Sequence, residues 1–159
     1  MLQEEQERVR AIYARHADIV YRVCFSRLGS AADAEDCVSD TFYKLLNTHK
    51  AFESAEHEKA WLLRVAINSS KNMRKRRAGT EVALSEATAV AQDTMENGDV
   101  LAALLALPEK LKTPVYLYYY EGYTGKEIAE LLRVPHSTMR NRIAEARRVL
   151  KEKLGEDYE

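Results

Sequence analysis

Apolar residues recur at helical spacing along most of this 159-residue chain, and its three prolines and six glycines fall between the periodic stretches. The pattern predicts a first helix over residues 4–28 and a second over about residues 30–48. Ser30 and Asp33 have the spacing of a capping box at the start of the second helix. The expected buried positions of that helix are Ala34, Cys37, Val38, Phe42, Leu45 and Leu46. Its expected outer positions are Glu35, Asp36, Ser39, Asp40 and Lys44.

A third helix is expected after a loop, from about residue 59 to a natural stop at Gly79. Its apolar face holds Trp61, Leu62, Val65, Ala66 and Met73. Its C-terminal end is a block of four bases, Arg74, Lys75, Arg76 and Arg77. One base would be enough to complement the negative end of the helix dipole, so four favour a surface that contacts nucleic-acid phosphates. Trp61 could stack on a base, but its place on the apolar stripe favours the core.

The composition changes between residues 79 and 99, which hold five acidic residues and no base. Residues 1–78 hold 14 Lys/Arg and 11 Asp/Glu, a net charge of +3, and residues 101–159 hold 10 and 9, a net charge of +1. The acidic segment is rich in small residues and only weakly periodic, which predicts a linker. It is either a solvated tether or a segment that mimics nucleic acid in a positively charged channel. The chain is therefore expected to be all-α, with small helical modules at 1–78 and 100–159 joined by a linker at 79–99.

The second module is expected to contain four helices, with turns that include Pro108 and Pro135. The third of these helices should begin at Thr124, which has capping-box spacing to Glu127. It should end before Pro135, because the residue before a proline avoids the α conformation. Ser137 is expected to cap the last helix. Two capped helices joined by a short turn are typical of a helix-turn-helix.

The last helix has a clear division into two faces. Its expected buried stripe is Met139, Ile143, Ala146 and Leu150. The positions left facing mostly outward are Thr138, Arg140, Asn141, Ala144, Glu145, Arg147, Arg148 and Lys151. In the major groove of DNA, arginine can pair with guanine and asparagine with adenine. A solvated face of a small bundle is the alternative, and the turn chemistry favours groove reading.

No catalytic constellation is visible in the sequence. Cys24 and Cys37 lie on apolar faces without CxxC spacing, which predicts reduced, packed thiols rather than metal ligands. The four histidines are scattered and no glycine-rich phosphate loop is present, so we expect no enzyme activity, no metal site and no cofactor. No apolar run approaches membrane-spanning length, and the N-terminus is too charged for a signal peptide. These features predict a soluble, cytoplasmic protein with no membrane insertion.

Two widely separated parts of the chain resemble the same family. The stretch DAEDCVSDTFYKLL at residues 33–46, followed by AWLLRVAINSSKNMRKRR at residues 60–77, resembles sigma region two. The stretch LPEKLKTPVYLYYYEGYTGKEIAELLRVPHSTMRNRIAEARRVLKEKL at residues 107–154 resembles sigma region four. In this order and at this length, the two together are similar to the extracytoplasmic-function (ECF) group of bacterial RNA polymerase sigma factors. Such proteins bind core polymerase and direct it to promoters.

The resemblance implies a role for each surface. It implies that Asp36, Ser39 and Asp40 bind the clamp helices of the polymerase β′ subunit. The residues that it places at the −10 promoter element are Trp61, Asn68, Asn72, Arg74, Lys75, Arg76 and Arg77. Those that it places at the −35 element are Ser137, Thr138, Arg140, Asn141, Ala144 and Glu145. The implied partners are therefore core RNA polymerase, including its β flap, promoter DNA and an anti-sigma factor.

Three positions depart from the family pattern. Asn72 stands where an aspartate is common, Arg133 where the turn usually has glycine, and Glu145 where a base is frequent. A carboxylate at position 145 could accept a hydrogen bond from a cytosine amine or repel phosphate, so the promoter sequence stays open.

Two other functions fit parts of the sequence: an autonomous helix-turn-helix repressor or activator, and a helical adaptor that binds only protein. A repressor would need a symmetric dimer, whereas this chain has one reading helix and a tether.

Overall fold

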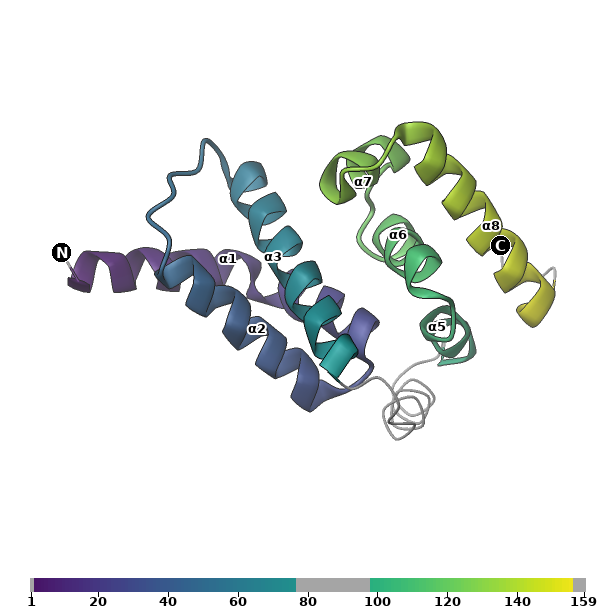
Figure 1. Cartoon of the computed structure of the whole chain (residues 1–159), viewed down its shortest axis with the longest axis horizontal. Coiled ribbons are helices and arrows are strands. Elements are labelled where there is room, and N and C mark those ends of the chain that lie inside the picture. Colours follow the sequence, from purple (N-terminus) through teal and green to yellow (C-terminus); the bar gives the residue numbers. More distant parts are fainter. Residues whose placement is uncertain (1, 77–97, 156–159) are drawn as a thin grey trace.

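The computed structural model describes residues 2–76 and 98–155, and every regular element in these two ranges is a helix (Figure 1). The all-α prediction is confirmed. The helices are α1 (Leu2–Leu28), α2 (Ala31–Leu46), α3 (Ala55–Arg76), α5 (Gly98–Leu105), α6 (Glu109–Tyr119), α7 (Gly125–Leu132) and α8 (His136–Leu154). The predicted linker at 79–99 lies almost entirely outside the described residues, and so do Arg77 and the predicted helix stop at Gly79.

The first module is built from α1, α2 and α3, which all pack against one another. The Ser30 side chain accepts a hydrogen bond from the backbone N–H of Asp33 and caps α2, as predicted. Five of the six expected core positions of α2 are buried, but Leu46 is 37% exposed and that part of the prediction is wrong. Each four-residue step turns a helix about 40° beyond a full circle, so the row from Val38 through Phe42 leaves the core face by Leu46.

An ion cluster ties the start of α3 to α1. The carboxylate of Glu58 accepts hydrogen bonds from Nε and Nη2 of Arg15, at 3.0 and 3.1 Å. It also lies 2.8 Å from the Nε2 atom of His16. Burial acts to raise the pKa of Glu58, but these hydrogen bonds and charges outweigh it and the pKa is lowered. The cluster fixes the N-terminal end of α3 within the first module.

The second module contains α5 to α8, with α5, α6 and α7 all packed on α8. The predicted stripe of α8 is buried at all four positions, Met139, Ile143, Ala146 and Leu150. Pro114 lies inside α6, although the prolines were expected between helices. Its ring lacks the N–H of that helical turn, but the residue is buried in the module and packing overrides its local preference.

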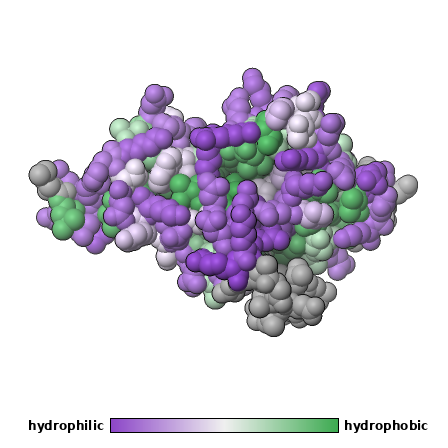
Figure 2. Space-filling view, viewed as in Figure 1, coloured by the Kyte–Doolittle hydropathy of each residue, from purple (hydrophilic) through white to green (hydrophobic). Residues whose placement is uncertain are grey.

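The two modules also pack together. Helix α1 contacts α6 and α3 contacts α7, and most of the buried apolar residues of both modules belong to one connected cluster, apart from Leu101 and Leu105 of α5. In the space-filling view, polar side chains cover much of the surface, with hydrophobic surface visible near the middle between the two modules (Figure 2). The structure is therefore a closed arrangement, with α3 facing the second module.

Candidate nucleic-acid interface

The helix-turn-helix consists of α7, a short turn and α8. The predicted capping box is present: the Thr124 hydroxyl accepts from the Glu127 N–H at 3.1 Å, and the Glu127 carboxylate accepts from the Thr124 N–H at 2.9 Å. These hydrogen bonds lower the pKa of Glu127. Helix α7 ends at Leu132, and its C-cap residue Arg133 has left-handed backbone angles of φ 58° and ψ 48°. Among the described residues, Arg133 is the only one other than glycine with positive φ.

The predicted cap of the last helix is wrong. Helix α8 begins at His136 with Pro135 in the N-cap position, and no side chain caps its free N–H groups. Pro135 has φ −59° and ψ 145°, an extended conformation that suits this position, where the missing N–H of proline is not needed. Ser137 instead lies exposed in the first turn.

The predicted reading face of α8 is open. Thr138 is half-buried, and the exposed members of the set are Ser137, Arg140, Asn141, Ala144 and Glu145. These five recur at helical spacing and so share one side of α8, opposite the buried stripe. Arg140 and Asn141 make no hydrogen bond or ion pair with another described residue. Both side chains are therefore free to contact a ligand.

The predicted −10 residues have mixed environments along α3. Asn68, Asn72, Lys75 and Arg76 are exposed, whereas Trp61 is half-buried. The Trp61 ring lies 5.7 Å from that of Phe52, between centroids, and lines a groove. Trp61 is thus neither a fully buried core residue nor a fully exposed ring on which a base could stack.

Arg74 points toward the second module in this arrangement. One of its guanidinium nitrogens lies 3.6 Å from the Glu109 carboxylate of α6, and the same nitrogen, although buried, has no hydrogen-bond partner among the described residues. Arg74 is therefore separated from the other described bases of its block, Lys75 and Arg76, which face solvent.

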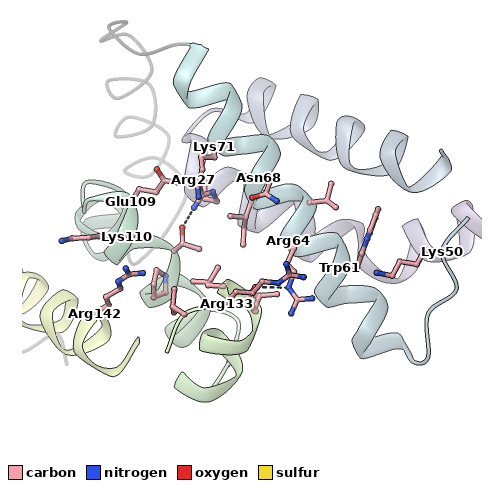
Figure 3. A pocket seen from close by; sticks show the side chains of 17 residues that line it. Arg27, Lys50, Trp61, Arg64, Asn68, Lys71, Glu109, Lys110, Arg133 and Arg142 are labelled. Atoms are coloured by element: carbon pink, nitrogen blue, oxygen red, sulfur yellow. Dashed lines mark hydrogen bonds and ion pairs between the residues drawn. The ribbon is translucent and has the colours of Figure 1, made fainter. Parts of the chain in front are cut away.

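A groove of about 830 Å³ lies between the modules (Figure 3). Its charged lining residues are Arg27, Lys50, Arg64, Lys71, Lys110, Arg133, Arg142 and one acid, Glu109. Trp61 and Asn68 belong to its α3 wall. Sequence reasoning missed this groove, because its lining comes from segments more than a hundred residues apart that carry no shared local pattern.

The predicted polymerase-contact residues lie on α2. Asp36 and Ser39 are exposed, but Asp40 is engaged inside the chain. Its carboxylate accepts a hydrogen bond of 2.6 Å from the Ser69 hydroxyl of α3 and lies 3.2 Å from the Lys44 ammonium. The hydrogen bond from Ser69 is the main reason that the pKa of Asp40 is lowered.

A polar pocket of about 480 Å³ brings these α2 residues beside α3. Asp36 and Asp40 line it together with Asn72 and Arg76. Residues predicted to face polymerase and residues predicted to face DNA thus share one pocket. Nothing in the spacing of the sequence pointed to Ser69 as the link between them.

The remaining titratable groups form no site of their own. Cys24 and Cys37 are free and fully buried, which confirms the prediction of packed thiols, and the interaction with Cys37, together with burial, raises the pKa of Cys24. Among the described side chains, no three His, Cys, Asp or Glu gather in a way that could hold a metal ion. No described helix combines the length and apolar character that crossing a bilayer requires.

Comparison with known proteins identifies both modules. Residues 12–80 match the family Sigma-70 region 2, and residues 97–150 match Sigma-70, region 4. The chain is 32% identical over 149 residues to the ECF RNA polymerase sigma-E factor of Haemophilus influenzae, covering 81% of this chain and 78% of that protein. It is 26% identical over 169 residues to the ECF RNA polymerase sigma factor SigW of Bacillus subtilis, covering 94% and 90%.

A solved structure has the same fold. The sigma factor RpoE of Bartonella quintana, in complex with the anti-sigma factor NepR, superposes with a TM-score of 0.69 at 21% sequence identity, over 99% of each chain. The region 2 and region 4 matches flank the acidic segment in the order expected from the sequence. The chain therefore belongs to the extracytoplasmic-function group of RNA polymerase sigma factors.

Proposed function

We propose that this sigma factor reads the −35 element with α8 and the −10 element with α3. The open face of α8 carries the first half of the proposal: Arg140 and Asn141 extend from its first two turns without a partner in the described chain. The pair has the donors and acceptors that distinguish guanine and adenine in the major groove. On α3, Asn68 and Asn72 are exposed four residues apart, and Lys75 and Arg76 follow as phosphate contacts.

Core polymerase would dock on α2. Asp36 and Ser39 are exposed on its outer face and are suited to the clamp helices of the β′ subunit. Asp40 would support this surface from behind, because its carboxylate already accepts from Ser69. The β flap would contact the second module, as the family resemblance implies. The complex of RpoE with NepR supports an anti-sigma factor as a further partner.

Sigma factors are regulatory proteins, and this role needs no catalytic group of the chain itself. Transcription takes place in the bacterial cytoplasm, so we place the protein there. The promoter sequence is not fixed by the residues, and Glu145 in particular can either select cytosine or weaken phosphate binding nearby.

The experiment that tests the function is run-off transcription with core polymerase on a genomic library. We expect initiation at a defined set of promoters with both proteins present and none with either alone. The purified protein alone should bind duplex DNA poorly. High-affinity footprints on a palindromic operator without polymerase would overturn the proposal in favour of an autonomous repressor.

The polymerase contact has a separate test. Asp36→Lys should weaken co-purification with core enzyme about tenfold or more, since it places a like charge against a basic partner surface. Asp36 is exposed, so the thermal midpoint should not change. Glu7→Lys, at an exposed position of α1, is the matched control. Equal co-purification of the two variants would move the contact away from α2.

A further inference from the structure

The groove between the modules collects positive charge from both of them. Its charged lining comes from α1, α3, α6, α8 and the connections that precede α3 and α8, with seven cationic residues and one acidic residue. The lining therefore carries a formal net charge of +6, whereas the whole chain carries −1. A cleft lined by charges of one sign focuses the electrostatic field and attracts ions of the opposite sign.

Five of these cations make no hydrogen bond or ion pair with another described residue. They are Lys50, Lys71, Lys110, Arg133 and Arg142. Lys50 and Lys110 lie at opposite ends of the close-up view, with Arg64 and Arg133 between them (Figure 3). The positive charges thus form an extended row rather than one compact cluster.

The one acid of the lining, Glu109, cannot balance this charge. Its carboxylate already accepts from Arg27, whose side chain is 2% exposed, and a nitrogen of Arg74 lies 3.6 Å from it. That Arg74 nitrogen is buried and has no hydrogen-bond partner among the described residues. Lys112 is buried in α6, and burial, followed by Arg74 and Arg27, lowers its pKa from 10.5 to about 8. Positive charge is therefore in excess at this junction, even where Glu109 is closest.

The groove suits a ligand that carries several negative charges close together. Arginine and lysine side chains bind phosphate oxygens, arginine through paired hydrogen bonds and lysine as a point charge. In a nucleic-acid strand a sugar separates each phosphate from the next, and each nucleotide adds a base that the groove would have to hold. A chain of directly linked phosphates carries a charge on every phosphate without this bulk. It matches a row of cations better than a strand or a single phosphate ion does.

We propose that the groove is a binding site for an oligophosphate, meaning a linear chain of directly linked phosphates that is either inorganic or carried by a nucleoside. Lys110 and Arg142 bind its phosphates at one end of the groove, and Lys71 and Arg133 bind them farther along. A chain long enough to span the groove also reaches Lys50. Both modules contribute, because Lys50 and Lys71 belong to the first and the other three cations to the second. The ligand relieves the repulsion among these cations and strengthens the contact between the modules.

Trp61 provides a direct signal of binding, because it is the only tryptophan of the chain and lines the groove. The purified full chain is titrated with orthophosphate, inorganic tripolyphosphate and a longer linear polyphosphate at constant ionic strength. We expect tripolyphosphate to change the Trp61 fluorescence in a saturable way, with one ligand per chain by calorimetry, and the longer polyphosphate to act at lower concentration. Orthophosphate should bind about tenfold or more weakly than tripolyphosphate, since it reaches only one part of the row. Equal binding of orthophosphate would mean an adventitious ion only and would overturn the proposal.

Substitutions locate the site. Lys110→Gln with Arg142→Gln should weaken tripolyphosphate binding about tenfold or more, because it removes two unpaired cations from the groove. Lys126→Gln with Lys153→Gln is the matched control, since both lysines are exposed on the second module outside the groove lining and the net charge changes by the same amount. The control should bind tripolyphosphate as the parent does. Equal weakening in both double variants would mean a non-specific effect of charge and would overturn the proposal.

A second pair guards against misfolding of the first. Lys50→Gln with Lys71→Gln changes two exposed side chains of the first module, so this variant should fold as the parent does, which thermal melts check. It should weaken binding of the longer polyphosphate about tenfold or more, since both cations line the groove. If both groove variants keep the affinity of the parent, the proposal is overturned.

Calorimetry with ATP and GTP distinguishes the two sources of the ligand. Tighter binding of either nucleotide than of tripolyphosphate assigns a ligand carried by a nucleoside, and equal or weaker binding assigns an inorganic one. If neither a nucleotide nor a polyphosphate binds, the proposal is overturned. Short single-stranded DNA that binds more tightly than tripolyphosphate, with the same dependence on Lys110 and Arg142, would also overturn it and assign the groove to a nucleic-acid strand.

Discussion

Helices α3 and α8 are both proposed to read DNA, yet they differ in how far the rest of the chain contacts them. Helix α8 buries a narrow apolar stripe and leaves Arg140 and Asn141 exposed, without a polar partner among the described residues. Helix α3 is held on two sides, by α1 and α2 through its core positions and by α7 through Arg64. The proposed base-reading side chains of α8 thus make no polar contact with another described helix, whereas α3 carries an arginine that binds the second module.

The largest effect is expected at the junction between the two modules. Arg27→Ala should lower the free energy of unfolding by about 3–5 kcal/mol, because it removes one member of a buried ion pair and leaves Glu109 and the hydroxyls of Ser70 and Thr113 without their donor. Chemical denaturation measures it. Arg148→Ala, at an exposed ion pair of α8, should change stability by less than about 1 kcal/mol. Equal losses of stability for both variants would mean that the contacts of Arg27 contribute no more to stability than an exposed surface ion pair does.

On the open helix, the same kind of change should act on DNA and not on the fold. Arg140→Ala should weaken discrimination at one base of the −35 element by about 1–3 kcal/mol, which is the range for a bidentate base contact. Its thermal midpoint should stay at the parent value, because the side chain is exposed and has no partner in the described part of the chain. Run-off transcription from promoters mutated one base at a time measures the discrimination. A uniform loss at all promoters would assign Arg140 to phosphate rather than to a base.

These two helices also show what local sequence patterns can and cannot predict. The stripe of α8, the Thr124–Glu127 box and the Ser30 cap depend on residues a few positions apart, and they were predicted correctly. The errors at Leu46, Pro114 and Ser137 arose where neighbouring packing or an adjacent proline decided between local options.

The environment of α3 could not be predicted in this way. Arg64 lies more than sixty residues from the α7 carbonyls that it binds, and Arg27 more than eighty from Glu109. Arginine in an amphipathic helix is equally consistent with solvent, DNA or a second module, and only the fold chooses among them. The DNA and polymerase roles of individual residues remain predictions for the same reason, since their partners lie outside the chain.

Lys112 is expected to give the junction between the modules a pH dependence. Lys112 is buried, and its ammonium donates to the Leu105 carbonyl at 3.4 Å. The charged groups that act on it are Arg74 of α3, Arg27 of α1 and Glu109 of α6. Burial, followed by the two arginines, lowers the pKa of Lys112 from 10.5 to about 8.

The unfolded chain therefore binds more protons than the folded one between about pH 8 and 10.5, and stability should rise with pH in that window. We expect a gain of about 1–2 kcal/mol between pH 7 and 9.5. Above pH 10 the raised pKa of Tyr116 acts in the opposite direction, so the measurement should end below that value. In Lys112→Met the rise should disappear, and denaturation curves at several pH values show whether it does. A rise of the same size in the variant would trace the effect to another group.

The smallest effect is expected at the turn that joins the two helices of the reading unit. Arg133 adopts a left-handed conformation that costs a residue with a Cβ about 1–2 kcal/mol. Glycine avoids this strain but loses more conformational entropy on folding, by about 0.5–1 kcal/mol. Arg133→Gly should therefore stabilise the protein by about 0.5–1 kcal/mol.

A matched control separates this conformational effect from the loss of a charged side chain. Glu130→Gly, one turn earlier at an exposed helical position of α7, should destabilise by about 1 kcal/mol. Opposite signs for the two glycines in thermal melts would show that backbone conformation at Arg133 decides the result. A destabilised Arg133→Gly would mean that the arginine side chain, which lines the groove, contributes more to the closed arrangement than its strained backbone removes. That outcome would assign the turn to the contact surface between the two modules, rather than to the helix-turn-helix alone.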